Sequence, residues 1–257
     1  MAGPSHNHRV IVLRKIKLGE SDLILTMLSS EGSQLRAVAK GARKPQSPFS
    51  ARLELYSVAD VLIASGRSLG IIQEARVVSA NAALHASLEL SACAAPVAEL
   101  LWRVSQEGLP VLRLFDCTQA AFETLGRVAP EDGPRICAAA LIKILAFCGF
   151  RPSLTYCVSC GTPIDAPFNG EGDVSFSATE GGVVCQRCRA HVESVRVPWS
   201  AVRTADVLLR STFSDIVASP LDQRTVFAVL QLEHQWIREH ISCSMKSLLF
   251  LFSCGLF

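Results

Sequence analysis

Two pairs of cysteines have the spacing that metal ligands need. Cys157 and Cys160 are separated by two residues, as are Cys185 and Cys188, and the 24 residues 161–184 lie between the pairs. A Cys-x-x-Cys turn places two sulfurs side by side, and zinc takes four thiolates in a tetrahedron at about 2.3 Å. The sequence therefore predicts a structural zinc site made by these four cysteines. Because four sulfurs fill the coordination sphere, such a site leaves no position for a catalytic water.

Two other interpretations of the four cysteines stay open. A redox-active dithiol of the thioredoxin type is disfavoured, because it needs a βαβ context that the surrounding sequence lacks. An iron–sulfur cluster also uses four cysteines, and the spacing does not exclude it. Within the zinc interpretation we expect a purely structural role, in which the ion stabilises a hairpin that has no core of its own.

A basic segment is the second group that could do chemistry. Residues 40–44 read Lys-Gly-Ala-Arg-Lys, and residues 1–80 hold eleven Lys and Arg against six Asp and Glu, in a chain whose net charge is +2. Glycine lets the backbone approach a ligand closely, and the cations can meet phosphates. A charged run is more often a solvated loop, but the enrichment across the first 80 residues favours a localised site for a polyanion. Phe49, just beyond the segment, could stack on a base or pack against the fold.

The elements that must position these groups begin with strands. Short apolar runs separated by turn residues predict five strands, at residues 8–17, 22–28, 34–39, 53–64 and 69–78. Five short strands at such close spacing predict a small barrel. A five-stranded Greek-key barrel of the OB type is the first choice, and barrels of that type commonly bind single-stranded nucleic acid. An SH3-like barrel is the alternative.

Helices are predicted on both sides of the cysteines. Ahead of them, richness in Ala, Leu and Glu predicts helices at residues 81–93 and 96–107, with Pro96 in a first helical turn. Apolar periodicity predicts a helix at 111–128, and another apolar helix opens at Pro134. Behind them we expect a helix at 200–212 and a longer one capped by Asp222. Around the cysteines, we expect strands at 174–177 and 183–184 and a loop at 169–173.

The predicted fold class is α+β. An N-terminal five-stranded OB-type β-barrel is followed by an α-helical domain with an inserted four-cysteine zinc knuckle. The predicted boundaries give a nucleic-acid-binding barrel at 1–80, a first helical part at 81–150, the knuckle at 151–196 and a second helical part at 197–257.

Several functional classes are disfavoured by what the sequence lacks. It contains no Gly-x-x-x-x-Gly-Lys-Ser/Thr loop, no Gly-x-Gly-x-x-Gly fingerprint and no Gly-x-Ser-x-Gly elbow, so we do not expect an enzyme. No apolar run reaches the ~18–20 residues that span a bilayer, and no secretory signal is recognisable. We expect a cytoplasmic protein without membrane contact and without a disulfide framework.

The barrel, the helices and the cysteine knuckle, in this order, resemble the RecO family of bacterial DNA repair proteins over nearly the whole chain. Three segments carry the resemblance together with the four cysteines: residues 14–22 (Arg-Lys-Ile-Lys-Leu-Gly-Glu-Ser-Asp), residues 39–45 (Ala-Lys-Gly-Ala-Arg-Lys-Pro) and residues 150–152 (Phe-Arg-Pro). Lys-Gly-Ala-Arg is a weak signal alone and becomes fairly specific beside the knuckle. The chain departs from the family at residues 242–257, which have little basic character, and its last ten residues, 248–257, are apolar.

The resemblance implies a non-catalytic recombination mediator of the RecF pathway, located in the cytoplasm at the nucleoid. Such a protein binds single- and double-stranded DNA and anneals complementary strands. Together with RecR it helps RecA load onto DNA coated with single-stranded DNA-binding protein, whose C-terminal tail it contacts. Carried onto this chain, the resemblance makes Lys40, Arg43 and Lys44 the first DNA contacts. The further DNA contacts that it suggests are Arg14, Lys17, Arg36 and Arg52.

Two alternatives belong to other functional classes. In the first, the chain is a zinc-containing protein-interaction scaffold without direct DNA binding, so its partners would stay bound after nuclease treatment and after charge reversal on the barrel. In the second, it is a zinc-dependent enzyme acting on RNA or nucleotides. Such an enzyme needs an open metal position, which a cobalt-substituted protein with fewer than four sulfur ligands would reveal.

Overall fold

A computed structural model describes residues 4–66, 68–164 and 172–257 of the chain. The chain forms two compact units, Met1–Arg127 and Val128–Phe257, and each unit contains fully buried apolar residues of its own. Across the described residues, no helix combines the length and the apolar character needed to cross a membrane. The finer division at residues 80, 150 and 196 stays a prediction.

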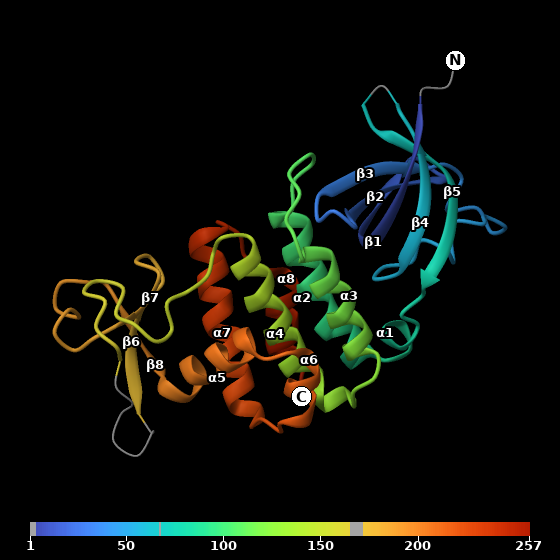
Figure 1. The fold of residues 1–257 in the computed structure, drawn as a ribbon. Helices are drawn as coiled ribbons and strands as arrows, with labels where there is room; N and C mark the ends of the chain where they lie inside the picture. Colours follow the sequence, from blue (N-terminus) through green and yellow to red (C-terminus); the bar gives the residue numbers. More distant parts are fainter. Residues whose placement is uncertain (1–3, 67, 165–171) are drawn as a thin grey trace. The chain divides into compact units, whose positions relative to one another are not determined.

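The first unit opens with five strands that close into a barrel (Figure 1). They are β1 (Ser5–Leu18), β2 (Asp22–Ser29), β3 (Gln34–Ala39), β4 (Val58–Ala64) and β5 (Gly70–Ser79). The strand order is β1-β2-β3-β5-β4, and β4 pairs with β1 to close the barrel. β3 and β5 run parallel, with Ala37 opposite Gly70, and the other pairs are antiparallel. The predicted five-stranded OB-type barrel is confirmed.

Alternating side chains fill this barrel. Val10 and Val12 of β1 and Leu25 and Met27 of β2 are fully buried in its core, as the two-residue period of a strand requires. A bulge after Val12 shifts the register, so that Arg14 pairs with the residue between Leu25 and Met27. Because successive residues of a strand face opposite sides, the bulge turns Arg14 to the outside of the barrel.

The fourth strand begins later than predicted. β4 starts at Val58 rather than at residue 53, because Tyr56 has a left-handed backbone with φ of 67° that an extended strand cannot contain. The Tyr56 N–H donates instead to the carbonyl of Val12 at 2.8 Å. Leu53 and Tyr56 are nevertheless buried, with 2% and 5% of their surface exposed. Their apolar character therefore reflects burial in a turn rather than in a strand.

Three helices complete the first unit: α1 (Ala83–Ala86), α2 (Leu88–Val104) and α3 (Leu114–Leu125). The prediction of two helices that meet near Pro96 is wrong, because Pro96 lies inside the single helix α2. Proline removes the N–H that would bond to the carbonyl of Ala92, which costs about 3 kcal/mol in a helix interior. Nine of the 17 residues of α2 are buried, and this packing keeps the helix continuous.

The second unit combines a helical body with a small sheet that leads into and out of the cysteine turns. Its elements are η1 (Pro130–Asp132), α4 (Gly133–Phe147), β6 (Asp173–Ser177), β7 (Gly182–Val184), β8 (Val195–Pro198), α5 (Trp199–Arg210), α6 (Phe213–Ala218), α7 (Gln223–His240) and α8 (Lys246–Ser253). The predicted strands at 174–177 and 183–184 and the helix opening at residue 134 are confirmed. Asp222 caps α7 as predicted, accepting the N–H of Thr225 at 3.0 Å. The predicted loop at 169–173 lies mostly outside the described residues.

The apolar C-terminal segment forms a helix with a place in this body. Leu248 and Leu251 of α8 are buried, and the ring of Phe252 lies 6.4 Å from that of Phe227 in α7. Much of the apolar C-terminal segment 248–257 therefore packs against α7. Leu249 and Phe250 remain about half exposed, at 46% and 48%.

Candidate metal centre and nucleic-acid interface

The four predicted cysteines come together. The sulfurs of Cys157, Cys160, Cys185 and Cys188 all lie within 4.8 Å of one another, and Cys160 Sγ is 3.7 Å from Cys185 Sγ. In a tetrahedron with metal–sulfur distances of about 2.3 Å, the sulfurs stand about 3.8 Å apart. The Cys160–Cys185 distance matches this value, and the other sulfur–sulfur distances exceed it by at most about 1 Å. No second group of metal-ligand side chains with this geometry occurs in the described part of the chain. The donor set and its spacing can hold a metal ion.

Two turns and one short strand position these sulfurs. Gly161, with φ of 70°, closes the first turn by donating its N–H to the carbonyl of Cys157 at 2.8 Å. β7 delivers Cys185 to the start of the second turn. The Val158 N–H donates to the carbonyl of Val183 in β7 at 3.0 Å and so ties the first turn to this strand. Backbone hydrogen bonds therefore bring the two cysteine pairs face to face.

Hydrogen bonds around two of the sulfurs favour the thiolate. Burial raises the pKa of Cys157, but N–H groups of Cys185, Cys160 and Ser159 donate to its sulfur, and the net shift of its pKa is downward. The Cys185 N–H lies 3.3 Å from that sulfur. Hydrogen bonding to Thr162, whose Oγ1 is 3.3 Å from Cys160 Sγ, lowers the pKa of Cys160 to about 6. Thiolate is the form that binds a metal ion.

The pKa of Cys188 shifts in the opposite direction. Hydrogen bonding to Ser159 lowers it, but the sulfurs of Cys185 and Cys160 raise it more, to about 11. The difference from Cys160 arises because one sulfur of a close pair keeps its proton when the other ionises. A dication at the centre of the cluster would displace the remaining protons and hold all four sulfurs as thiolates.

The predicted DNA-contact residues lie on the barrel, and all of their side chains are exposed. They are Arg14 and Lys17 on β1, Arg36 on β3, Lys40, Arg43 and Lys44 in the segment after β3, and Arg52 in the loop before β4. Lys17 pairs with Leu23, which in turn pairs with Ala39, the residue before Lys40. The register therefore places Lys17 and Lys40 at the same end of the barrel.

A clasp joins the basic segment to the turn between β1 and β2. The N–H of Gly41 donates to Asp22 Oδ1 at 2.7 Å, and the hydroxyl of Ser21 donates to the same oxygen at 2.9 Å. These two hydrogen bonds lower the pKa of Asp22, and the positive charges of Lys40 and Lys44 lower it further. Two segments that the sequence separates by about twenty residues are thus one structural feature, which we call the clasp (residues 19–22 and 40–44).

Arg43 is part of the clasp. Its Nη1 donates to the carbonyls of Gly19 at 3.0 Å and Glu20 at 2.7 Å, and its backbone N–H donates to the carbonyl of Ser21 at 2.8 Å. One nitrogen of its guanidinium group is thus directed toward the β1–β2 turn. Arg43 therefore has a structural task beside any contact with DNA.

Arg14 and Arg52 also have partners within the first unit. The guanidinium group of Arg14 lies over the ring of Trp102 in α2, 4.3 Å from its centroid. Arg52 donates to the carbonyl of Ala75 at 3.3 Å. A surface hollow of about 330 Å³ beside Arg52 is lined by two carboxylates, those of Asp60 and Glu74, as well as by Arg76. These surroundings suit phosphate less well than the clasp does.

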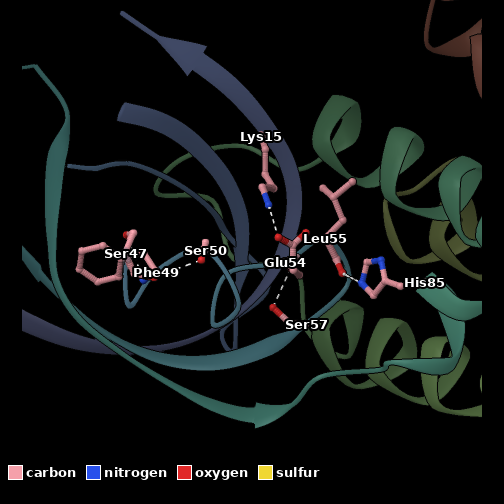
Figure 2. Close-up of polar contacts among 8 residues, drawn as sticks. All are labelled: Lys15, Ser47, Phe49, Ser50, Glu54, Leu55, Ser57 and His85. Atoms are coloured by element: carbon pink, nitrogen blue, oxygen red, sulfur yellow. Dashed lines mark hydrogen bonds and ion pairs between the residues drawn. The ribbon is translucent and has the colours of Figure 1, made fainter. Parts of the chain in front are cut away.

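Local hydrogen bonds and an ion pair to β1 hold the loop that follows the basic segment (Figure 2). Lys15 Nζ forms an ion pair with Glu54 at 2.9 Å, so that this cation is neutralised within the barrel. The backbone N–H of Phe49 donates to the hydroxyl of Ser47 at 3.2 Å. Phe49 is half-buried and packs against the barrel core, which favours the packing interpretation of this ring over base stacking.

Four of the predicted cations remain available. Among the described residues, no hydrogen bond or ion pair engages the side chains of Lys17, Arg36, Lys40 and Lys44. Their charges therefore face solvent and can meet an anion without first breaking an internal contact.

The chain matches the family described as "Recombination protein O N terminal" at residues 1–81 and the family described as "Recombination protein O C terminal" at residues 85–249. It is 32% identical over 253 residues to a protein of Frankia casuarinae, with 96% of this chain and 98% of the relative covered. A relative from Bifidobacterium adolescentis is 29% identical over 247 residues, with 95% and 98% covered. A third, from Cutibacterium acnes, is 34% identical over 194 residues, with 72% and 75% covered.

All three relatives are described as "DNA repair protein RecO". The family matches together span the barrel, both helical regions and the four cysteines. The chain therefore belongs to the RecO family of DNA repair and recombination proteins.

Proposed function

We propose that this chain is a recombination mediator of the RecF pathway that binds single- and double-stranded DNA through the basic end of its barrel. It anneals complementary strands and, with RecR, helps RecA load onto DNA coated with single-stranded DNA-binding protein. The observation that carries the proposal is the clasp, which presents Lys40 and Lys44 to solvent beside Lys17 on a barrel of the OB type. The work needs no catalytic group, because annealing and loading exchange non-covalent contacts.

The spacing of these cations suits a nucleic-acid backbone. Lys17 lies on β1 and Lys40 follows the end of β3, with β2 between these two strands. Because neighbouring strands lie about 4.8 Å apart, the backbones at Lys17 and Lys40 are about 10 Å apart, and their flexible side chains can reach neighbouring phosphates. Phosphate contacts of this kind position DNA without reading its sequence, as annealing of arbitrary strands requires.

Zinc is the ion that we assign to the cysteine cluster. Cys157, Cys160, Cys185 and Cys188 would hold it through four sulfurs, which all lie within 4.8 Å of one another. Bound there, zinc supplies structural cross-linking of the two turns rather than catalysis. An iron–sulfur cluster, the alternative that the spacing leaves open, would give visible absorption that zinc does not.

The remaining contacts of the mediator are with proteins. The C-terminal tail of single-stranded DNA-binding protein, RecR and, indirectly, RecA are the proposed partners, and the cytoplasm at the nucleoid is the proposed location. A protein-interaction scaffold without direct DNA binding would have the same protein partners, but it would not need exposed cations at this end of the barrel. The exposed cations at the clasp favour the DNA-binding mediator.

An annealing assay on coated strands tests the mediator role. Two complementary oligonucleotides, each saturated with single-stranded DNA-binding protein, should anneal much faster in the presence of the chain than in its absence. The reason is that a mediator contacts both the coating protein and the DNA, whereas a generic cationic protein is excluded by the coat. Naked oligonucleotides provide the control. Acceleration on naked strands without acceleration on coated strands would contradict the mediator role and leave only general DNA binding.

A further inference from the structure

We propose that Asp22 is a positioning residue for DNA binding: its carboxylate holds the basic segment 40–44 in the shape that presents Lys40 and Lys44 to phosphates. The inference rests on the proposed function and names a residue that shapes the proposed DNA-binding site. Asp22 is the first residue of β2, and it receives two hydrogen bonds at one oxygen, from Gly41 and from Ser21.

The clasp depends on a hydrogen bond from the backbone N–H of Gly41 to the carboxylate of Asp22. Gly41 has φ of 65°, a left-handed conformation that glycine adopts without strain, and its N–H points at Asp22 Oδ1 at 2.7 Å. The distance is short, as expected for an N–H that donates to an ionised acceptor. Lys44 N–H then donates to the carbonyl of Gly41 at 3.0 Å, which closes a turn between the two lysines. One carboxylate thus fixes the turn that carries both cations.

Arg43 holds the other side of the same turn. It contributes three hydrogen bonds to backbone carbonyls of residues 19–21, two of them from its guanidinium Nη1. Ala42, between Gly41 and Arg43, is buried with 3% of its surface exposed and packs with the barrel core. The segment is therefore anchored at residues 41, 42 and 43, and its two lysines flank the anchored stretch.

The hydrogen bonds of the clasp should strengthen DNA binding by ordering the basic segment in advance, rather than by adding contacts with the DNA. A loop that is already in its binding shape does not lose conformational freedom when DNA arrives, whereas a released loop must be ordered at that moment. Release of the clasp should therefore weaken DNA binding by about tenfold. The lysines themselves stay in place, so the number of counterions released on binding should not change.

Two substitutions at one position separate this role from others. Asp22→Ala removes the acceptor and should weaken binding of a labelled single-stranded oligonucleotide by about tenfold at every salt concentration, with an unchanged slope of log affinity against log salt. Asp22→Asn keeps Oδ1 as acceptor for both hydrogen bonds and removes a negative charge beside two lysines. It should bind within about threefold of wild type.

Binding of the Asp22→Ala variant at wild-type affinity, or equal weakness of the Asn and Ala variants, would overturn the proposal. Amide hydrogen exchange at Gly41 gives a readout that does not depend on DNA: it should be slow in the wild type and the Asp22→Asn variant and fast in the Asp22→Ala variant. A wild-type chain that binds no DNA would refute the proposed function, while the exchange measurement would still decide whether the clasp exists. Fast exchange at Gly41 in the wild type would overturn the clasp itself.

Discussion

Replacing Cys185 by serine should abolish tight metal binding and loosen the two cysteine turns, while the barrel and the helical body stay folded. Structural zinc sites contribute about 10–16 kcal/mol of binding free energy, and a serine hydroxyl is a poor substitute for a thiolate. We expect zinc affinity to fall by more than about 100-fold. The three strands β6, β7 and β8 keep their own packing, because the ring of Phe176 in β6 rests against that of Trp236 in α7 at 5.7 Å.

The measurement combines metal content with local protection. Competition with a chromophoric chelator gives the affinity, and hydrogen exchange maps the loosening to residues 155–162 and 185–191. Cys254→Ser is the matched control, because Cys254 lies outside the cluster and is likewise half-buried. Cobalt substitution of the wild type should give the spectrum of a four-sulfur tetrahedral site. A Cys185→Ser variant that still binds one zinc ion per chain at wild-type affinity would contradict the assignment.

Replacing Glu233 by methionine should raise the free energy of unfolding by about 1–3 kcal/mol at neutral pH. Glu233 lies on α7 with 3% of its surface exposed, and neither of its carboxylate oxygens has a hydrogen-bond partner within the described residues. It borders a narrow apolar cavity with Leu145, Phe176 and Trp236. A buried polar group without a partner destabilises the folded state, and an unbranched apolar side chain of similar length removes that cost.

The same residue should make stability depend on pH in a defined direction. Burial raises the pKa of Glu233 well above its ordinary value, so we expect the folded state to keep this proton to a higher pH than the unfolded state does. Its contribution to stability is therefore fully present below the unfolded pKa of about 4.5 and is lost as pH rises toward the folded pKa. Glu233→Gln, which cannot ionise, should match the wild type near pH 4 and exceed it at pH 7–8.

Chemical denaturation of the wild type and the two variants across pH 4–8 measures this effect. His234, the neighbouring residue, has a pKa lowered by burial and by Arg238, and it destabilises the fold as pH falls. All three proteins carry His234, so its contribution cancels in the difference between them. A wild-type minus Gln difference that does not vary with pH would show that Glu233 is not buried as a neutral acid.

The metal ligands and the barrel were predictable because short-range patterns specify them. Cys-x-x-Cys spacing indicates a turn, and short apolar runs between turn residues indicate strands, whose buried residues Leu25, Met27, Ala37 and Ala39 follow a two-residue period. The burial of Glu233 had a sequence signal as well. It lies at helical spacing from Val226, Val229 and Trp236, on the apolar side of α7. A charged residue is ordinarily expected at the surface, so this spacing alone did not lead to the prediction of a buried glutamate.

Other features depend on contacts between distant segments and could not be predicted from local pattern. The left-handed Tyr56, which delays β4, is held by its bond to Val12, 44 residues earlier. Pro96 continues a helix because the surrounding core compensates for its missing N–H. Arg43 reads as one cation in a basic run, yet its bonds to the β1–β2 turn make it an anchor of that run. In each case tertiary contacts override the local preference.

The most direct test of the central claim, that the clasped end of the barrel is the DNA-binding surface, is a salt-titrated binding measurement on Lys40→Glu/Lys44→Glu. The control is Arg203→Glu/Arg238→Glu, which makes the same change in net charge at exposed positions of α5 and α7. The barrel variant should lose on the order of 100-fold in affinity for single-stranded DNA at low salt, and its log–log salt slope should fall by about 2. The control should stay within about threefold of wild type. A barrel variant with wild-type affinity and slope, or a control weakened as much as the barrel variant, would contradict the account.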